Sequence, residues 1–415
     1  MNKNYSTRFR YLPRWIAPLL QQASQDHSVV VLTGARQVGK STLLKHEEPF
    51  RRWRYWNLDD LDTLAQARFD PGSLWAGVDA IVLDEAQKAP SVFSAIKLAV
   101  DQQPDRRFIL SGSANWLLFS RSSESLAGRA VYFVLDPFTH GELQMHPPSD
   151  VLWRALHGEW PSDAMVEPPP DPSPLMAGGG MPALLRFSSE ESKMQWWDGY
   201  VSTYLERDLR QISQIANLVD FHRFMQLLAL RCGQILNQSG LARDAQLKQP
   251  TAHRYLNLLE ATYLVERLPA FASSHSTRLM KSPKVFWREV GLALFLSGYF
   301  TRESLNHAKE WGNFFETFLY HQLRVLVSLW TPPGRLFTWR QRSGTEVDFI
   351  LEHGRQLLAI ELKATDRPSF RDTAGIRVFL QEVPHATGGI LLHGGKEIRR
   401  FAQNIVALPW NLVTG

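Results

Sequence analysis

A short glycine-containing segment carries the residue types that bind phosphate groups. It reads Gly34, Ala35, Arg36, Gln37, Val38, Gly39, Lys40, Ser41 and Thr42, and fits the pattern G-x-x-x-x-G-K-[ST] at every fixed position. The two glycines let successive backbone N–H groups face a phosphate, and a helix beginning near Lys40 would add the positive end of its dipole. We expect Lys40 to contact the β- and γ-phosphates and Ser41 to bind Mg²⁺. The alternative is a glycine turn without a ligand.

Two adjacent carboxylates follow a second apolar run. Residues 80–83 lead directly into Asp84 and Glu85. We expect Asp84 to hold Mg²⁺ through water, and Glu85 to orient and polarise the water that attacks the γ-phosphate. A hydroxyl after another apolar run, that of Ser111 or that of Ser113, could reach the γ-phosphate or this water, or could belong to an ordinary turn. Together with residues 34–42, these side chains predict a Mg²⁺-dependent ATP hydrolase.

Another set of charged residues lies towards the end of the chain. Asp348 lies in one apolar run, and Glu361 and Lys363 end the next run after a short turn. Two strands joined by such a turn run antiparallel, and period-two alternation places Glu361 and Lys363 on the face opposite to Ile360 and Leu362. We expect Asp348 and Glu361 to hold Mg²⁺, because charges in an apolar hairpin are costly to desolvate without a role. Lys363 would orient a nucleophilic water or neutralise a phosphate.

Residues 236–268 have the pattern of two short helices followed by a hairpin. Pro250 suits the first turn of the second helix, and Tyr255, Leu256 and Leu259 form its apolar face. This pattern is similar to winged-helix domains, in which the second helix enters the DNA major groove. The residues that we expect to contact DNA are Lys248, Thr251, His253, Arg254 and Asn257. The alternative is a helix that only packs or contacts protein, because its exposed face mixes acidic and basic residues.

Apolar runs and helical periodicity predict the elements that position these residues. Short apolar runs that alternate with amphipathic stretches are typical of buried parallel strands in β–α units. The runs in the first part of the chain are Val29–Thr33, Tyr55–Leu58, Ile81–Asp84, Phe108–Ser111 and Val131–Leu135. Residues 195–266 have a helical pattern. Residues 161–182 contain seven prolines, which predicts a linker or long exposed loop without a helix or central strand.

The last third of the chain returns to mixed structure. It contains a helical run from Phe314 to Leu326 and strand-like runs at Val347–Leu351, Leu357–Leu362 and Gly389–Leu392. The predicted fold class is therefore α/β, with a parallel sheet first, a helical region second and an α/β domain last.

The composition excludes several classes of protein. The chain has 415 residues, 44% hydrophobic and 21% charged, so two or three folded domains are expected rather than overall disorder. The net charge of +5 is compatible with a polyanionic partner without requiring one. The single cysteine, Cys232, excludes an internal disulfide framework. The sequence has neither a run of the roughly 18–20 apolar residues that cross a bilayer nor a signal peptide, so we expect a cytoplasmic protein without membrane association.

Several segments occur in an order that resembles a known family. Besides residues 34–42, they are Asn57-Leu58-Asp59-Asp60, Leu83-Asp84-Glu85-Ala86-Gln87, Leu110-Ser111-Gly112-Ser113, Leu126-Ala127-Gly128-Arg129, Pro137-Phe138 and Glu142. The chain resembles a bacterial and archaeal family of AAA+-type ATPases whose second half is a domain of unknown function 4143. The resemblance implies a homo-oligomer, such as a hexameric ring, in which an arginine of one subunit contacts the γ-phosphate bound by the next. Arg129 is the matching residue, and a guanidinium there would stabilise charge on the transferred phosphoryl group.

The C-terminal segment is similar to restriction-endonuclease-like nucleases. Asp348, Glu361 and Lys363 match their D…E-x-K pattern, and Glu316 matches a glutamate that often completes the metal site from the preceding helix. The alternative is a nuclease-like fold kept for binding DNA or other subunits. The chain departs from the family at Glu289, where relatives tend to carry an aspartate, so the role of that acid is not transferred.

The resemblance and the residue patterns together define the expected organisation. The expected domains are an AAA+-like P-loop ATPase core at 1–146, a proline-rich linker and helical connector at 147–215, a winged-helix domain at 216–280 and a restriction-endonuclease-like domain at 281–415. The expected function is ATP hydrolysis coupled to DNA binding, remodelling or translocation, with ATP and Mg²⁺ as cofactors and DNA cleavage left open. The alternatives are a nucleotide-dependent protein-binding switch without nucleic acid, and a DNA-binding scaffold with an inactive nuclease fold.

Overall fold

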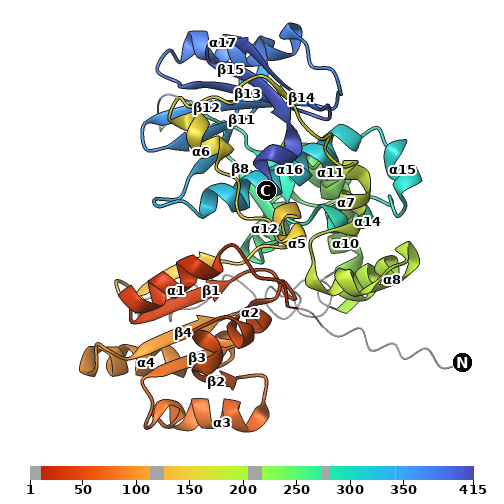
Figure 1. Cartoon of the computed structure of the whole chain (residues 1–415). Helices are drawn as coiled ribbons and strands as arrows, with labels where there is room; N and C mark the ends of the chain where they lie inside the picture. Colours follow the sequence, from red (N-terminus) through yellow and green to blue (C-terminus); the bar gives the residue numbers. More distant parts are fainter. Residues whose placement is uncertain are drawn as a thin grey trace, which may run out of the picture. The chain divides into compact units, whose positions relative to one another are not determined.

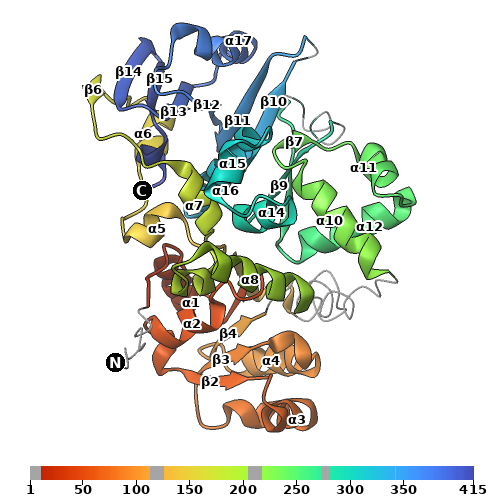
Figure 2. The same ribbon diagram turned by 90° about the vertical axis from the view of Figure 1, so that its right-hand side faces the viewer.

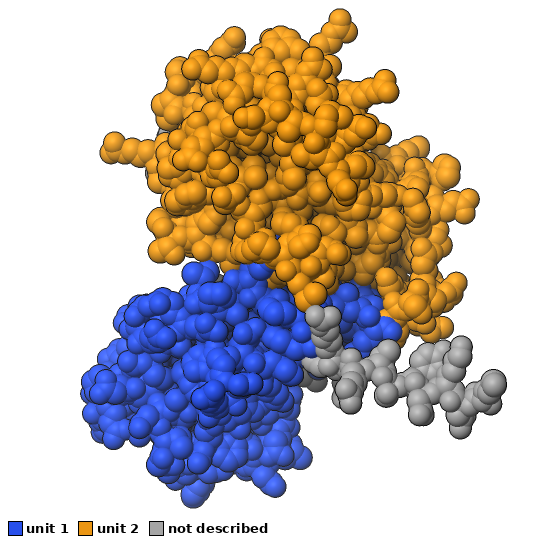
Figure 3. Space-filling model, viewed as in Figure 1, with its two compact units in different colours: residues 1–138, 181–186, 258–264 blue, residues 139–180, 187–257, 265–415 orange. Residues whose placement is uncertain are grey.

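The chain folds into two compact units, which Figure 3 colours separately. The computed structural model describes all residues except 1–10, 113–125, 204–216, 273, 275–277, 279–280 and 342. Unit 1 comprises Met1–Phe138, Met181–Arg186 and Leu258–Leu264, and unit 2 comprises Thr139–Gly180, Phe187–Asn257 and Val265–Gly415. The domain boundaries expected from the sequence stay predictions.

Five parallel strands form the sheet of unit 1, as the apolar runs predicted (Figure 1). In chain order they are β1 (Val29–Thr33), β2 (Arg54–Asn57), β3 (Ala80–Asp84), β4 (Arg107–Ser111) and β5 (Ala130–Val134). Their spatial order is β2-β3-β4-β1-β5. The strand β4 therefore lies between β1, which precedes the glycine-containing loop, and β3, which ends at Asp84. Because all five strands are parallel, their carboxyl ends lie at one edge of the sheet.

Helices cover this sheet because its central strands are apolar on both faces. The helices of unit 1 are α1 (Ala17–Asp26), α2 (Lys40–His46), α3 (Leu61–Phe69) and α4 (Ser91–Gln102). In one core cluster, Phe93 and Ile96 of α4 pack with residues of β1, β3 and β4, such as Leu83. Figure 2 shows α3 and α4 with the strands of unit 1 in a second view. Every residue of β1 is buried, as expected for a strand inside a parallel sheet.

Unit 2 contains a helical region, as the periodicity predicted, together with a small sheet. The helices are α5 (His140–Gln144), α6 (Val151–Leu156), α7 (Pro172–Gly178), α8 (Glu190–Tyr200), α10 (Leu218–Ala229), α11 (Gln238–Asp244) and α12 (Gln249–Ala261), whose last residues belong to unit 1. The small sheet is antiparallel, with the order β7-β9-β8. Its strands are β7 (Gln234–Ile235), β8 (Val265–Leu268) and β9 (Lys284–Trp287). The strand β9 lies beyond residue 280, in the expected C-terminal domain. Its partners β7 and β8 lie in the expected winged-helix domain at 216–280.

The prediction that residues 161–182 contain no helix is wrong. Pro172 and Pro174 lie in the first turn of α7, where a missing N–H group costs no helical hydrogen bond. The Asp171 side chain accepts a hydrogen bond from the backbone N of Ser173 and so caps the helix. The short strand β6 (Ala164–Met165) also lies in this segment and pairs with β14 at the edge of a sheet. Prolines at a helix start and beside an edge strand are compatible with both elements.

The C-terminal part of unit 2 is built on a seven-stranded sheet of order β10-β11-β12-β13-β15-β14-β6. Its other strands are β10 (Arg335–Arg340), β11 (Glu346–His353), β12 (Gln356–Lys363), β13 (Gly388–His393), β14 (Glu397–Ala402) and β15 (Ile405–Pro409). As predicted, β11 and β12 are antiparallel, with Phe349 opposite Ile360. The accompanying helices are α14 (Val290–Leu296), α15 (Arg302–Asn306), α16 (Trp311–Ser328) and α17 (Ala374–Glu382). Within the described part of the chain, no helix is long and apolar enough to span a membrane.

We predict that replacing Gly389 of β13 by alanine destabilises unit 2. A Cβ atom there would lie 2.2 Å from Cγ2 of Ile376 on α17, so the Ile376 side chain or its surroundings must shift. Overpacking of this kind typically costs about 1–3 kcal/mol of unfolding free energy. Thermal unfolding should show a lower midpoint for Gly389→Ala. Gly312→Ala is the control, because nothing lies within 4 Å of its Cβ position, and an equal loss in both variants would contradict the prediction.

Candidate functional site

The loop between β1 and α2 has the backbone shape that a phosphate-binding loop requires. Gly34, Gln37 and Gly39 have φ angles of 144°, 62° and 104°, in the left-handed region. A Cβ atom at Gly34 would lie 2.2 Å from the carbonyl oxygen of Leu135, so only glycine fits. The loop ends where Lys40 begins α2. The predicted P-loop residues 34–42 therefore lie together at the carboxyl end of β1.

The ammonium group of Lys40 lies inside this loop. Its Nζ donates hydrogen bonds to the carbonyl oxygens of Gly34 at 3.0 Å and Ala35 at 2.9 Å. Burial lowers the pKa of Lys40 to about 8, while the negative charges of Glu85 and Asp84 act in the opposite direction. Carbonyl groups carry no net charge, so they leave the positive charge of Lys40 available to an anion. A polyphosphate is the kind of anion that suits a loop of this shape.

Asp84 lies at the end of β3 and is buried. Its carboxylate accepts hydrogen bonds from the hydroxyl groups of Ser111 and Tyr55, and from the backbone N of Glu85 at 3.1 Å. Ser111 reaches Asp84 because β4 is the neighbour of β3 in the sheet. Of the two predicted hydroxyls, Ser111 therefore lies in the site, whereas Ser113 lies outside the described residues.

Glu85 follows Asp84 and is half-buried. Its backbone adopts a left-handed conformation with φ of 55°, which is uncommon for a residue other than glycine. The Gln87 side-chain amide donates a hydrogen bond to one carboxylate oxygen. Burial raises the pKa of Glu85, while the positive charge of Lys40 and the hydrogen bond from Gln87 act against this effect. Glu85 is thus close enough to Lys40 and Asp84 for their charges to act on it, and its role with water stays a prediction.

Tyr55 is a residue of this site that the sequence patterns did not identify. It lies on β2, and its hydroxyl donates to Asp84 and also has Ser41 as a hydrogen-bond partner. Burial, followed by the negative charge of Asp84, raises the pKa of the phenol. Tyr55 thus connects Ser41 and Asp84, the two residues expected to hold a metal ion. The sequence shows only that Tyr55 lies on the strand before the Asp84 strand. Its contact with Asp84 follows from the sheet order, in which β2 is the neighbour of β3.

Arg129 lies apart from the phosphate-binding loop. It directly precedes β5, at the edge of the parallel sheet opposite to the carboxyl ends of the strands. Its guanidinium makes two hydrogen bonds with the carboxylate of Asp101 on α4, at 2.7 and 2.9 Å, and this contact raises the pKa of Arg129. The structure therefore does not bring Arg129 into the nucleotide site of its own chain. Its predicted contact with a neighbouring subunit's nucleotide stays a prediction.

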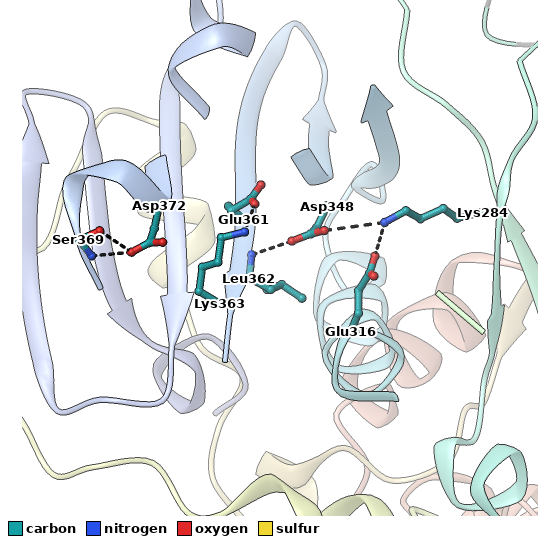
Figure 4. A network of polar contacts seen from close by, with 8 residues as sticks. All are labelled: Lys284, Glu316, Asp348, Glu361, Leu362, Lys363, Ser369 and Asp372. Atoms are coloured by element: carbon teal, nitrogen blue, oxygen red, sulfur yellow. Dashed lines mark hydrogen bonds and ion pairs between the residues drawn. The ribbon is translucent and has the colours of Figure 1, made fainter. Parts of the chain in front are cut away.

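The charged residues of the C-terminal sheet lie close together (Figure 4). Asp348 on β11 accepts a hydrogen bond from the backbone N of Leu362 at 2.8 Å, and Nζ of Lys363 lies 2.7 Å from Oε1 of Glu361. Continuing the register of β11 and β12 places Asp348 opposite Glu361. The second oxygen of Glu361, Oε2, is buried without a hydrogen-bond partner.

The expected metal site of Glu316, Asp348 and Glu361 stays a prediction, and its surroundings include a residue without a predicted role. Lys284 of β9 lies between two of these acids, with Nζ 2.8 Å from Oε1 of Glu316 and 3.8 Å from Oδ1 of Asp348. The described residues contain no group of three or more His, Cys, Asp or Glu side chains that could hold a metal ion. In this arrangement an ammonium group lies between two of the carboxylates that were expected to hold Mg²⁺. The sequence patterns assigned no role to Lys284.

Burial dominates the acid–base behaviour of this cluster. It raises the pKa of Glu316 and of Glu361 to about 8 each, and the charge of Asp348 adds to both effects. The pKa of Asp348 is also raised by burial, although Lys284 opposes the shift. The pKa of Lys284 is raised: burial acts to lower it, but the charges of Glu316 and Asp348 outweigh that effect. Glu316 and Glu361 therefore bind a proton more readily than ordinary glutamates, whereas Lys284 keeps its proton more firmly.

Most of the predicted DNA-contact residues are exposed around the start of α12. Lys248, His253, Arg254 and Asn257 are exposed, and Thr251 is half-buried. Tyr255, Leu256 and Leu259 are buried on the other face, as the periodicity predicted. Asn257 Nδ2 lies 3.0 Å from His253 Nε2, and Arg267 donates to Asn257 Oδ1 at 3.1 Å.

Two clefts of unit 2 lie near each other. A cleft of about 770 Å³ is lined in part by polar residues of α11 and α12, among them Gln238, Gln249 and His253. A second cleft of about 760 Å³ is lined by residues such as Lys281, Arg340 and Glu346. Both clefts include Ile235 and Ser282 in their walls, so they adjoin each other.

Glu289 has a structural position that accounts for an acid there. It caps α14 by accepting a hydrogen bond from the backbone N of Gly291 at 2.9 Å, and it accepts another from the N of Gly180 at 2.9 Å. Burial raises the pKa of Glu289 to about 7. These contacts tie residue 180 to the start of α14.

Comparison with known proteins identifies segments that correspond to the two sheets. A family model described as an AAA domain matches residues 26–144, and the domain of unknown function DUF4143 matches residues 311–413. A further domain of unknown function, DUF8612, matches residues 173–303. The expected AAA-type ATPase domain and the expected domain of unknown function 4143 are thus confirmed.

Two solved structures are similar to parts of this chain. A Walker-type ATPase of Pyrococcus abyssi is 15% identical, with a TM-score of 0.44 over 68% of this chain and 94% of that one. A signal-transduction ATPase with numerous domains and a tetratricopeptide-repeat sensor, from Pyrococcus horikoshii, is 10% identical, with a TM-score of 0.21 over 75% of this chain and 45% of that one.

Two mycobacterial proteins match almost the whole chain. The uncharacterized proteins Mb2031c of Mycobacterium bovis and Rv2008c of Mycobacterium tuberculosis are each 30% identical over 398 residues, which cover 95% of this chain and 82% of theirs. This match includes both the AAA domain and the DUF4143 segment of the present chain. The chain therefore belongs to the family of these mycobacterial proteins, and within it combines an AAA-type P-loop ATPase domain with a C-terminal DUF4143 domain.

Proposed function

We propose that the protein hydrolyses ATP with Lys40, Asp84 and Glu85, and that this turnover acts on DNA bound by unit 2. The observation that supports hydrolysis is the meeting of the loop ammonium, the buried Asp84 and the half-buried Glu85 at one edge of a parallel sheet. Binding alone would need only the loop. The second carboxylate beside it supplies a group to orient water, which hydrolysis requires.

The residues of unit 1 fit a magnesium ion with the nucleotide. The Ser41 hydroxyl and the Asp84 carboxylate both interact with the Tyr55 hydroxyl, so two oxygen ligands lie close together beside the loop. Mg²⁺ bound there would neutralise charge on the phosphate oxygens. In the same proposal, Ser111 holds the Asp84 carboxylate in place, and Arg129 acts on a neighbouring subunit's nucleotide within a homo-oligomer.

DNA is the proposed partner because of the surface around α12. Lys248, His253 and Arg254 place cationic or hydrogen-bonding groups at an exposed helix face, and His253 also lines a cleft between α11 and α12. A helix–turn–helix with an adjacent three-stranded sheet suits the winged-helix mode of binding. The rival function is a nucleotide-dependent switch that binds protein only. ATPase rates measured with and without single-stranded, duplex and branched DNA separate the two, since only the first function predicts stimulation.

We predict that Glu85→Gln retains ATP while hydrolysis falls by about 10²–10⁴-fold, because the amide can no longer polarise the attacking water. Nucleotide binding is measured by equilibrium titration and turnover by phosphate release. Glu190→Gln, an exposed change in the first turn of α8, is the control and should leave turnover unchanged. Normal phosphate release by Glu85→Gln would remove Glu85 from the mechanism.

We predict that ATP affinity falls as the pH rises above about 8. The pKa of Lys40 is about 8 in the nucleotide-free loop, and bound phosphates would raise it, so binding at higher pH must take up a proton. The dissociation constant should be constant below pH 7 and increase by at most about tenfold per pH unit above pH 8. Calorimetry between pH 6.5 and 9.5 measures this. In Lys40→Arg the guanidinium stays charged, so the same dependence in that variant would exclude Lys40 as its source.

We predict that Arg254→Glu weakens DNA binding about tenfold and makes binding less dependent on salt, because it replaces a cation on the exposed face of α12. Fluorescence anisotropy at several salt concentrations measures both effects. Arg68→Glu on α3 changes the net charge equally and serves as the control. Equal loss in both variants would indicate a non-specific charge effect, and no loss in either would exclude α12 as the DNA-binding helix.

A further inference from the structure

Lys284 lies at one end of the polar network of unit 2, where it contacts Asp348 and Glu316 (Figure 4). It comes from β9, whereas Glu316 comes from α16 and Asp348 from β11. All three are buried or nearly so, and Nζ approaches Oε1 of Glu316 to 2.8 Å and Oδ1 of Asp348 to 3.8 Å. An ammonium group in contact with two acids from different elements supplies the attraction that a bound cation would otherwise provide.

The remaining oxygen atoms of the cluster leave little for a metal ion to bind. Oδ2 of Asp348 accepts from the Leu362 backbone, and Oε1 of Glu361 accepts from Lys363. In the described part of the cluster, Oε2 of Glu361 is buried without a hydrogen-bond partner. Mg²⁺ requires near-octahedral oxygen coordination, and its protein sites commonly use one or two carboxylates. An ion bound among these carboxylates would lie beside the ammonium groups of Lys284 and Lys363, and these cations would repel it.

Because Lys284 lies on β9, its contacts also connect two sheets of unit 2. β9 is the central strand of the β7-β9-β8 sheet, which follows the helices α10 to α12 in unit 2. Through Lys284, this small sheet is bonded to α16 and lies close to β11 of the larger sheet. A residue with these contacts fixes one sheet against the other.

We propose that the Lys284 ammonium takes the place of a divalent cation in this cluster, so that the C-terminal domain holds its carboxylates together without metal and does not cleave DNA. The cluster then serves to join the β7-β9-β8 sheet to α16 and β11. This inference concerns unit 2 alone and does not depend on ATP hydrolysis.

The test is a titration of the full chain with Mn²⁺, without nucleotide, followed by the electron paramagnetic resonance signal of the free ion. Asp84→Asn is present throughout, so that the ATPase site contributes little binding. The chain with Lys284 should show no Mn²⁺ site that depends on Asp348. Lys284→Ala frees oxygens of Glu316 and Asp348, and should gain one site that binds Mn²⁺ at least about tenfold more tightly, a typical effect of altering a metal site's surroundings. Adding Asp348→Asn should remove it.

Lys363→Ala is the matched control, because it removes the lysine that bonds to Glu361 and leaves Lys284 in place. It should not create the site that Lys284→Ala creates, and a site of equal affinity would overturn the assignment to Lys284. The proposal is also overturned if the chain with Lys284 binds Mn²⁺ and loses it on Asp348→Asn, or if it cleaves duplex or single-stranded DNA with Mg²⁺ or Mn²⁺. These two measurements need no change at Lys284, so they remain decisive if Lys284→Ala does not fold.

Discussion

A buried ammonium group needs partners, and the kind of partner decides what else can bind beside it. Lys40 hydrogen bonds to two backbone carbonyl oxygens, which hold its position without cancelling its charge. Lys284 contacts two carboxylates, which cancel it. The first lysine therefore attracts an anion such as a polyphosphate, whereas the second completes a closed network. Two lysines of similar burial thus give one open site and one closed cluster.

The sheet order of unit 1 brings the hydrolytic residues together. β4 separates β1 from β3, with Ser111 opposite Leu32 on one side and Leu110 opposite Leu83 on the other. The end of β4 therefore lies between the phosphate-binding loop and Asp84, and its hydroxyl can reach the carboxylate. β2 lies on the far side of β3 and contributes Tyr55. Tyr55, Asp84 and Ser111 lie on parallel strands, and Lys40 and Glu85 follow shortly after the carboxyl ends of β1 and β3, where ligands of open α/β sheets commonly bind.

The sequence predicted those features that depend on local patterns. The loop residues 34–42, the five strands of unit 1 and the β11–β12 hairpin follow from short motifs, apolar runs and period-two alternation. Tyr55 and Lys284 were missed because their roles depend on which distant strands become neighbours. The helix α7 was not predicted because the number of prolines in residues 161–182 argues against a helix. The first-turn positions of Pro172 and Pro174 are nevertheless compatible with one. At the expected metal site the sequence did not predict the contact between Lys284 and Glu316, because Lys284 comes from β9, outside the D…E-x-K pattern.

Coupling between the ATPase site and DNA requires an element on which both ligands act. The single helix α12 carries the predicted DNA-contact residues, and the chain from Leu258 to Leu264 belongs to unit 1. There the hydroxyl groups of Tyr263 and Thr33 lie 2.8 Å apart and are buried. Thr33 ends β1 and is followed by Gly34, the first residue of the phosphate-binding loop. A change in the loop when Lys40 turns from its carbonyls to a phosphate can thus reach α12 through one buried hydrogen bond and the backbone. Lys284 joins the Asp348 cluster into a closed network of contacts within unit 2. In the proposed function, α12 is therefore the more direct route by which ATP binding would act on DNA binding.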